Sequence, residues 1–437
     1  MGGQKYLFAS STSTSTRGFN MFAMALAIVF ALTLLIPHAM QAQTFSVIHY
    51  FSGGGDGANP YAGVTVGPGG VLYGTASGGG TPGDGTVFKL TPHGSSWAFS
   101  PLYKFTGGSD GAFPDGGVVI GPNGALYGTT GSGVNGPVYG TVFELRPPAH
   151  LVCRAILCYW DETTLYAFTG FPDGEYPAFE NLAFDHAGDI YGTTYEGGMY
   201  GLYPAGTVFE LTPSGGGYRE SIIHSFGSGS DGESPQSGVV LDTAGNVYGT
   251  TDGGGTGAVG TVYQLVPSHG GWVENVLVNF GGTGGSYPYG NLIIDASGNL
   301  YGVTASGGQN GYGVVYKLTP SGGGFTYSVL YSFSSLCQSQ GGVAMDTAGD
   351  FFGVCYGGGG AAQDGWIFEL TNCSQGCSVV DLHDFSGSDG TQPFGSPVLD
   401  AHGNLYGTTY TGGTGGSGCF LSGCGVVWEI AGAGSRP

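Results

Sequence analysis

Leu405-Tyr406-Gly407-Thr408-Thr409 is the stretch that decides how this chain folds, because it is one of seven near-copies of the same five-residue core. The tyrosine, or the phenylalanine that replaces it once, stands at positions 73, 127, 191, 248, 301, 352 and 406. The copies follow one another at intervals of about 50 to 65 residues, which indicates a propeller or a solenoid built from one repeated unit.

Three further apolar runs of strand length accompany each core. One precedes it, as in residues 238–242, and two follow it, as in residues 206–211 and 329–333. Residues with turn chemistry separate the runs, for example residues 242–246. Four antiparallel strands per repeat make a sheet with two apolar faces, and radial stacking of seven sheets buries both. This predicts an all-β, seven-bladed β-propeller. In each core the tyrosine should pack between blades, and the glycine after it should let a neighbouring backbone approach.

The two ends of the chain are out of phase with the repeat. Residues 45–51 match the fourth strand of a repeat, and residues 425–430 match the third. If the N-terminal strand pairs into the last blade, the ring closes and both open sheet edges disappear. An open solenoid would instead need polar caps, which the sequence lacks. We therefore expect a closed ring over residues 43–431, followed by a short tail, 432–437.

The first 42 residues differ from the rest. Lys5 and Arg17 lie in a polar lead, an apolar run covers residues 21–36, and a small-residue segment ends at Ala42. This order predicts a signal peptide, residues 1–42, and a secreted product, either extracellular or periplasmic. A retained anchor is the alternative, but the run is shorter than the ~20 residues that span a bilayer. After cleavage we expect no membrane span and a monomer.

Composition excludes one class of partner. Hydrophobic residues make up 41% of the chain and aromatic residues 13%, so packed cores can form despite 92 glycines. Only 9% of residues are charged, and the formal net charge is −21. A surface of this kind cannot neutralise phosphates, so nucleic acid is not expected as a partner.

Eight cysteines in an exported chain favour disulfides. A zinc site is the alternative, because Cys373 and Cys377 have a spacing that zinc ligands also use, but no histidine cluster accompanies them. The predicted pairs are Cys153 with Cys158, Cys337 with Cys355, Cys373 with Cys377, and Cys419 with Cys424.

The seven cores and their Gly-Thr-Val-Phe-Glu-Leu-Thr-Pro companions, as at residues 206–213, resemble the Gloeo/Verruco (GloVer) tandem repeat of exported bacterial proteins. The resemblance covers about residues 45–430. It implies an exported, surface-associated repeat protein without a defined catalytic activity. The chain departs from the family pattern in lacking a recognisable C-terminal anchor, and its sixth repeat is degenerate, with Phe352, Val354 and Cys355 in the core.

A second element, Asp-Gly-x-x-Pro, recurs between repeats. Its aspartates are Asp56, Asp110, Asp173, Asp231 and Asp389, and the fifth repeat has Gly284 instead. One interpretation is a ring of carboxylates near the channel mouth that binds calcium or sugar hydroxyls. The other is that each aspartate caps its own turn. Five equivalent copies favour the turn, since turn chemistry must recur in every blade. Apart from this possible calcium, the sequence predicts no cofactor.

His49, His224 and His383 occupy one repeat position in different blades. A shared metal site is therefore not expected, and the variety of residues at this position in other repeats favours a surface role on an edge strand. The metal-ligating residues, if any, stay unknown at this stage.

Two segments interrupt the repeat. Residues 147–163 form an insertion between the second and third repeats, and residues 410–424 form the longest loop on the expected working face. Aromatic side chains of that face suit stacking against sugars or peptide groups. The predicted ligand-binding residues are the five aspartates above together with Tyr195, Tyr200, Tyr203 and Tyr410.

No catalytic motif is present, and no catalytic residues are predicted. The preferred hypothesis is a non-catalytic secreted propeller that binds an extracellular polysaccharide or a surface protein. A secreted polysaccharide hydrolase or lyase acting at the channel mouth is the first alternative, because paired carboxylates are recognised only in three dimensions. A structural protein of the cell envelope is the second.

Overall fold

A computed structural model describes residues 43–133, 139–148, 159–177, 179, 181–200, 205–227, 229–374, 376–416, 418–419 and 423–434. Residues 43–435 form one compact unit. Several predictions lie outside the described residues: the signal peptide 1–42, Cys153 and Cys158, most of the insertion 147–163, Tyr203, and the end of the tail 432–437.

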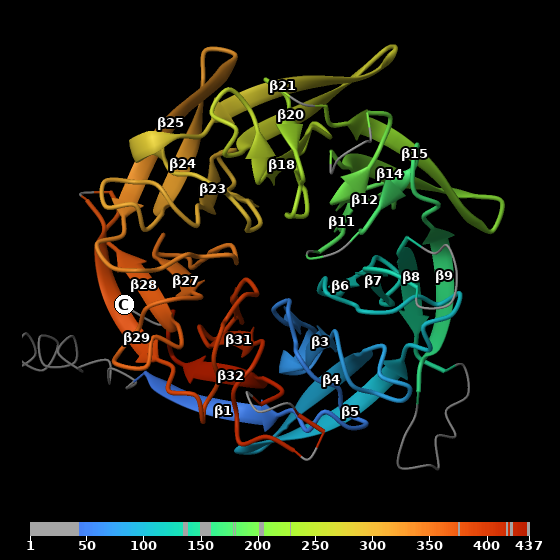
Figure 1. Ribbon diagram of the computed structural model, residues 1–437, viewed down its shortest axis with the longest axis vertical. Helices are drawn as coiled ribbons and strands as arrows, with labels where there is room; N and C mark the ends of the chain where they lie inside the picture. The colour runs from blue at the N-terminus through green and yellow to red at the C-terminus, as the bar shows by residue number, and fades with distance from the viewer. Residues whose placement is uncertain are drawn as a thin grey trace, which may run out of the picture. The chain divides into compact units, whose positions relative to one another are not determined.

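Seven four-stranded antiparallel sheets are arranged around a central axis, as Figure 1 shows. The predicted seven-bladed β-propeller is confirmed. Blade 1 contains β2 (Thr65–Val66), β3 (Leu72–Ala76), β4 (Thr86–His93) and β5 (Ser96–Lys104); blade 2 contains β6 (Val119–Ile120), β7 (Leu126–Thr130), β8 (Thr141–Arg146) and β9 (Asp161–Ala167); blade 3 contains β11 (Ala183–Phe184), β12 (Ile190–Thr194), β14 (Thr207–Ser214) and β15 (Gly217–Ser225). Blade 4 contains β17 (Val240–Leu241), β18 (Val247–Thr251), β20 (Thr261–Ser268) and β21 (Gly271–Asn279); blade 5 contains β22 (Ile293–Ile294), β23 (Leu300–Val303), β24 (Val314–Ser321) and β25 (Gly324–Ser332); blade 6 contains β26 (Ala344–Met345), β27 (Phe351–Cys355), β28 (Trp366–Thr371) and β29 (Ser378–Asp384). Blade 7 contains β30 (Val398–Leu399), β31 (Leu405–Thr409), β32 (Val426–Ala431) and β1 (Thr44–Tyr50). Two short ladders, β10 (Gly174–Glu175) with β13 (Glu196–Gly197) and β16 (Gly232–Glu233) with β19 (Gly253–Gly254), and two 3-10 turns, η1 (Pro68–Gly70) and η2 (Gly282–Gly284), lie in the loops.

The ring is closed by the N-terminal strand. Strand β1 pairs antiparallel with β32, from Thr44 opposite Ala431 to Tyr50 opposite Val426. Blade 7 therefore takes three strands from the C-terminal end of the described chain and its outer strand from the N-terminal end (Figure 1). This confirms the closure predicted from the phase of the repeat.

The packed core consists mainly of side chains from adjacent blades. Tyr191 of blade 3, for example, belongs to the same buried cluster as Val247 and Tyr263 of blade 4. The core tyrosine therefore packs between blades, as predicted. The following glycine makes room chiefly for a ring. A Cβ on Gly128 would lie 2.6 Å from the ring of Phe143 in the next strand of the same blade and 3.3 Å from the backbone oxygen of Gly117, so the glycine admits that ring as well as the predicted close backbone.

The hairpins between the first and second strands of each blade lie on one side, which we call the lower face. In the blade 4 hairpin, Asp242 accepts hydrogen bonds from the backbone N–H groups of Ala244 and Asn246, at 2.8 and 2.9 Å. Its second oxygen accepts one from the hydroxyl of Tyr248 at 2.9 Å. Equivalent backbone bonds recur at Asp185, Asp295, Asp346 and Asp400. These carboxylates are therefore turn caps.

Three of the four predicted disulfides are present: Cys337–Cys355, Cys373–Cys377 and Cys419–Cys424. The first explains the degenerate sixth repeat. Cys355 stands where the other cores have their last residue, such as Thr130 in blade 2, and Cys337 stands where blade 2 has the buried Ala112. The disulfide therefore ties the second strand of blade 6 to the connection that precedes this blade.

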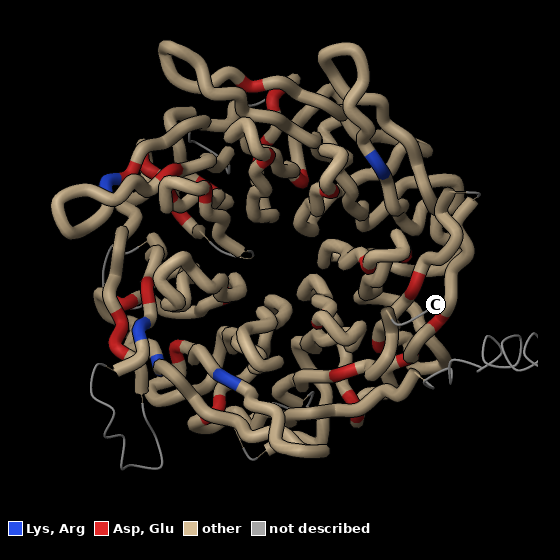
Figure 2. Tube along the Cα trace, turned by 180° about the vertical axis from the view of Figure 1, so that it is seen from behind, with Lys and Arg blue, Asp and Glu red and all other residues tan. Residues whose placement is uncertain are grey.

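Acidic residues are spread around the ring and basic residues are few, as Figure 2 shows from the opposite side. None of the helices in the described part of the chain has the length and apolarity that crossing a bilayer requires.

Candidate functional site

The loops between second and third strands and the connections to the next blade lie together on the side opposite the lower face, which we call the upper face. Backbone hydrogen bonds join the two sets, for example from Ala58 to Gly78 and from Phe113 to Asp84. Each Asp-Gly-x-x-Pro element belongs to one of these connections, which lead from an outer strand to the next inner strand.

Every aspartate of this element accepts hydrogen bonds from its own turn. The Asp110 carboxylate accepts them from the backbone N–H of Thr106 at 2.8 Å, from the Thr106 hydroxyl at 2.6 Å and from the N–H of Gly108 at 3.2 Å. Corresponding turn bonds occur at Asp56, Asp173, Asp231 and Asp389. The turn interpretation is confirmed. Ligand binding by these aspartates stays a prediction.

Each aspartate also contacts the residue six or seven positions before it, on the outer strand. The hydroxyls of Tyr103 and Tyr166 donate to Asp110 and Asp173 at 3.1 and 3.0 Å. Histidines replace these tyrosines elsewhere: the Nε2 atoms of His49, His224 and His383 lie 3.4, 3.5 and 2.9 Å from carboxylate oxygens of Asp56, Asp231 and Asp389. Between blades 4 and 5 the pair is Val278 and Gly284, so both polar partners are lost together.

The surface role expected for the three histidines is wrong. Their side chains are only 17–19% exposed, because each points toward the turn aspartate and packs against the next blade. The ring of His383, for example, stacks on Phe45 of blade 7 at 3.5 Å between centroids.

A channel of about 720 Å³ runs between the inner strands, lined by side chains such as Val64, Leu182 and Leu292. One residue of each inter-blade connection lies two or three positions before this lining, directly after the proline or, between blades 5 and 6, after Ser339. In the described residues it is Tyr61, Asp115, Gln236, Tyr289, Gln340 or Phe394. Its neighbour is the residue directly after each five-residue core, which is Ser77, Gly131, Tyr195, Asp252, Ala305, Tyr356 or Tyr410. We call these two sets the mouth positions.

Aromatic rings meet at the mouth across several blades. The ring of Tyr61, from blade 1, stacks on that of Phe394, from blade 7, with centroids 5.0 Å apart. It also lies 5.5 Å from Phe179 of blade 3, and its hydroxyl donates to Gln340 of blade 6 at 3.3 Å. Contacts that skip a blade place Tyr61 close to the axis. Tyr410 and Tyr356 complete the cluster, with centroids 5.6 and 5.0 Å from that of Phe394.

Two carboxyl groups accompany the aromatic rings. Burial raises the pKa of Asp115 to about 7, although Ser77 acts in the opposite direction. Burial, followed by repulsion from Glu233, raises the pKa of Asp252 to about 7, and the side-chain amide of Gln236 donates to Asp252 at 2.9 Å. Both residues are partly exposed while protein surrounds them closely, which is typical of groups in a recess. Burial therefore favours the protonated form of both carboxyls.

A groove of about 850 Å³ lies between blades 6 and 7 on the upper face. Its wall includes Tyr356 of the aromatic cluster and polar side chains such as Gln338, Gln392 and Thr411. Part of its rim, Gly412 to Gly416 with Cys419 and Gly423, comes from the long loop 410–424. The aromatic mouth and this polar groove are therefore continuous at Tyr356.

The predicted aromatic residues are only partly brought together. Tyr195 and Tyr410 are mouth residues, and Tyr195 lies 6.0 Å from Phe179 between ring centroids. Tyr200 is 71% exposed and belongs to neither the cluster nor the lining of the groove. Sequence reasoning missed Tyr61, Phe394, Asp115 and Asp252. The signal was present: when the repeats are aligned, these positions differ from blade to blade while their neighbours stay the same.

Solved structures share the fold at low identity. A fungal alcohol oxidase of the AA5 family, in complex with copper, matches 90% of this chain and 76% of its own at 11% identity and a TM-score of 0.52. PorZ, a surface component of the type-IX secretion system of Porphyromonas gingivalis, matches 86% of this chain and 47% of its own at 14% identity and a TM-score of 0.50. A candidate 6-phosphogluconolactonase from Bacteroides uniformis matches 77% of this chain and 88% of its own, at 14% and 0.50. At these identities the similarity shows the propeller fold alone.

No curated protein sequence matches the chain significantly. A family model, the Gloeobacter/Verrucomicrobia repeat, matches it twice, over residues 22–199 and 183–421. Together the two matches cover most of the chain, including the cores of all seven blades. The resemblance inferred from the repeated cores is thus confirmed, and the protein belongs to the Gloeobacter/Verrucomicrobia repeat family.

Proposed function

We propose that this protein is an exported binding propeller that holds a neutral extracellular polysaccharide at the mouth of the channel and in the adjoining groove. The observation that carries the proposal is the aromatic cluster of Tyr61, Phe394, Tyr410 and Tyr356 at positions that differ among otherwise similar blades. A side chain required for folding should recur in every blade. One required for a single ligand need not recur.

The chemistry of the mouth suits a sugar chain. Aromatic faces provide a flat apolar surface on which the C–H face of a pyranose can stack. Gln236, Gln392 and Thr411 offer neutral donors and acceptors for hydroxyls around those rings. The net charge of −21 repels anionic polymers, so a neutral glycan is a better ligand than a uronate or a sulfated one. A protein ligand would have to tolerate the same narrow, mostly uncharged mouth.

Export is part of this proposal. The order of charged, apolar and small residues in positions 1–42 supports it, and so do three disulfides, which persist in oxidising compartments. Detection of the mature protein outside the cytoplasm, with an N-terminus near Gln43, would test it. An intact N-terminus on the cytoplasmic protein would contradict it.

Affinity electrophoresis in gels containing neutral polysaccharides, after a glycan-array screen, tests the binding site. We expect retardation of the wild type and a loss of affinity of about tenfold or more in Y61A and in F394A, because each removes a ring from the centre of the cluster. Val273, on outer strand β21 and 51% exposed, provides the control: V273A should bind as the wild type does. Equal weakening by V273A and Y61A would sink the proposed site, and binding only to proteins on the array would reassign the ligand class.

A second candidate, a polysaccharide hydrolase or lyase, is favoured by Asp115 and Asp252. Carboxyls with a pKa near 7 are suited to general acid and base catalysis at neutral pH. Incubation of the polysaccharide that binds, followed by an assay for reducing ends or unsaturated products, distinguishes the candidates. Turnover that is lost in D115N or D252N would replace the binding-only function, whereas an unchanged polymer supports it.

A further inference from the structure

The outer strands of neighbouring blades meet at one repeated contact near the upper face. The residue that pairs with the turn aspartate lies on the outer strand of one blade and faces the outer strand of the next blade. The residue that it faces stands four positions before the one that pairs with the next blade's own turn aspartate. At two junctions this contact joins a histidine to a phenylalanine. His383 stacks on Phe45 at 3.5 Å, and His49 stacks on Phe99 at 4.1 Å.

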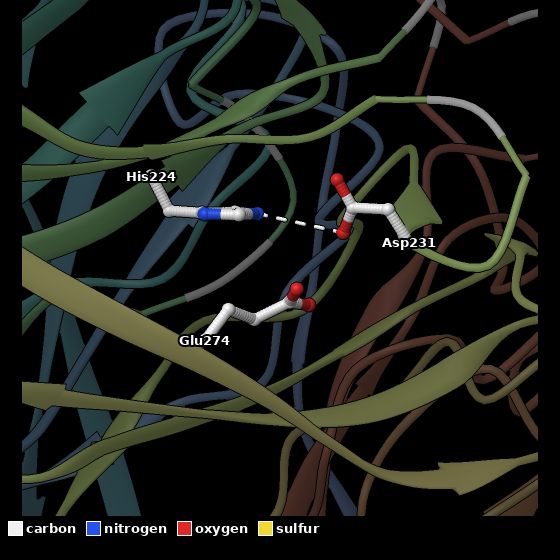
Figure 3. Close-up of side chains that lie close together, drawn as sticks. All are labelled: His224, Asp231 and Glu274. Carbon is white, nitrogen blue, oxygen red and sulfur yellow. Dashed lines mark ion pairs between the residues drawn. The ribbon is translucent and has the colours of Figure 1, made fainter.

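The junction between blades 3 and 4 differs. There the histidine is His224 of β15, its turn aspartate is Asp231, and the facing residue on β21 is Glu274 (Figure 3). One nitrogen and two carboxylate oxygens of these side chains all lie within 4.8 Å of one another. Among the described residues, no other group of three histidine, cysteine or acidic side chains is close enough to hold one metal ion.

Hydrogen bonding within the protein leaves two of these three ligand atoms unsatisfied. Nε2 of His224 and Oε1 of Glu274 are both shielded from solvent and have no hydrogen-bond partner. Nε2 of His49 and Oε1 of Glu220 share this state singly, but among the described residues only this junction brings two such atoms together. The Nε2 atom lies 3.5 Å from Oδ1 of Asp231, which is the outer limit for a hydrogen bond. Asp231 itself is held in place by the N–H groups of Gly227 and Gly232, at 2.6 and 2.8 Å. Buried polar atoms without partners are uncommon in native proteins, and two of them beside one carboxylate suit a shared cation.

The spacing of these atoms leaves room for a cation between them. With metal–ligand bonds of about 2.0–2.1 Å, tetrahedral geometry separates the ligand atoms by about 3.3–3.4 Å, close to the 3.5 Å between Nε2 and Oδ1. An imidazole nitrogen with two carboxylates is a ligand set for zinc and similar transition metals, whereas calcium takes oxygen ligands. We propose that His224, Asp231 and Glu274 form a zinc-type divalent cation site that joins blade 3 to blade 4.

Such an ion would hold the two outer strands together. His224 and Asp231 come from blade 3 and the turn after it, and Glu274 comes from blade 4. Because the site lies at the outer strands, away from the mouth residues, its occupancy should change stability and leave glycan binding unaffected. The same protein contains its own controls, since His49 and His383 keep the histidine–aspartate pair but have phenylalanine where Glu274 stands.

Zinc binding to the metal-free, full-length protein, carrying no affinity tag, is measured by competition with a chromophoric chelator at pH 7.5. We expect one tightly bound zinc ion in the wild type and an affinity at least about 100-fold lower in E274Q and in H224A, because two ligands no longer define the site. E274F imitates the junctions that use phenylalanine, so it should fold and also lose the ion. The matched control, H383A, removes a histidine of equal exposure and should keep the ion.

A second readout is the melting temperature. Zinc should raise it in the wild type and in H383A but not in E274Q or E274F, since an ion that binds only the folded state stabilises that state. The proposal would be overturned if the wild type bound no zinc at micromolar concentration, or if E274F and H224A both bound zinc as the wild type does. Loss of the ion in H383A would equally reject this assignment.

Discussion

The lower-face hairpins and the upper-face mouth are built from the same repeat but behave in opposite ways. At the lower face of blades 3 to 7, Asp185, Asp242, Asp295, Asp346 and Asp400 each accept the same two backbone hydrogen bonds, while blades 1 and 2 have Gly67 and Gly121 there. At the mouth, equivalent positions hold tyrosine, aspartate, glutamine and phenylalanine. Positions that recur in most or all blades serve the fold of the blade itself. Positions that differ between blades are free of that demand and can serve a ligand.

The largest expected effect comes from changing a uniform position. A Cβ on Gly128 would lie 2.6 Å from the fully buried ring of Phe143, so G128A must displace that ring. We expect a loss of about 3 kcal/mol in the free energy of unfolding, measured by urea denaturation. Gly217, whose added Cβ would meet nothing within 4 Å, is the control. G217A should change stability by about 0.5 kcal/mol or less. Equal effects would show that the repeated glycine is not a packing requirement.

A smaller effect is expected at the lower-face turns, where two aspartates with different numbers of hydrogen bonds can be compared. D242A removes an acceptor for Ala244, for Asn246 and for the Tyr248 hydroxyl, and should lower the free energy of unfolding by about 2–3 kcal/mol. Asp346 accepts the two backbone bonds, but Phe352 replaces the tyrosine in that blade. D346A should therefore lose about 1 kcal/mol. If urea denaturation showed a loss in D346A as large as that in D242A, the tyrosine hydroxyl would add nothing to stability.

The last effect concerns the mouth and depends on pH. The pKa values of Asp115 and Asp252 are about 7 in the folded protein and lie near 4 in an unfolded chain. The folded state thus holds more protons, and stability contributed at pH 4 is lost as the pH rises toward 7. In D115N/D252N, the fall in melting temperature between pH 5 and pH 8 should be smaller by a few degrees than in the wild type. An identical pH profile would show that these carboxyls ionise normally.

Much of the fold could be predicted from the sequence because the determinants are local and repeated. Seven copies of Tyr-Gly-Thr-Thr fix the number of blades, and the mismatch of residues 45–51 with residues 425–430 fixes the closure. Adjacent cysteines such as Cys373 and Cys377 pair across a short loop, so their disulfide followed from spacing alone. The role of the core glycine was predicted only in part, because alternation along a strand does not show that a ring fills the gap beside the backbone.

The candidate site was harder to predict because its members come from different blades. Tyr61 of the first blade meets Gln340 of the sixth, past the seventh blade that separates them, and no sequence spacing brings them together. Glu274 is remote from His224 in sequence for the same reason. The pairing of Tyr103 with Asp110 and of His224 with Asp231 at a constant interval was within reach, because valine and glycine replace both partners in the fifth repeat.

The pairing of β1 with β32 has a consequence for assembly. These strands stand at opposite ends of the described chain, so blade 7 forms only when residues far apart in sequence meet, the slowest kind of contact to establish. Until then, β32 has an unpaired edge that fits any copy of β1, including one from a second molecule. At low protein concentration each chain will pair its own β1 with its own β32. At high concentration two or more chains can exchange their β1 strands and form domain-swapped dimers or larger open assemblies. Refolding yield of the monomer should therefore fall as protein concentration rises.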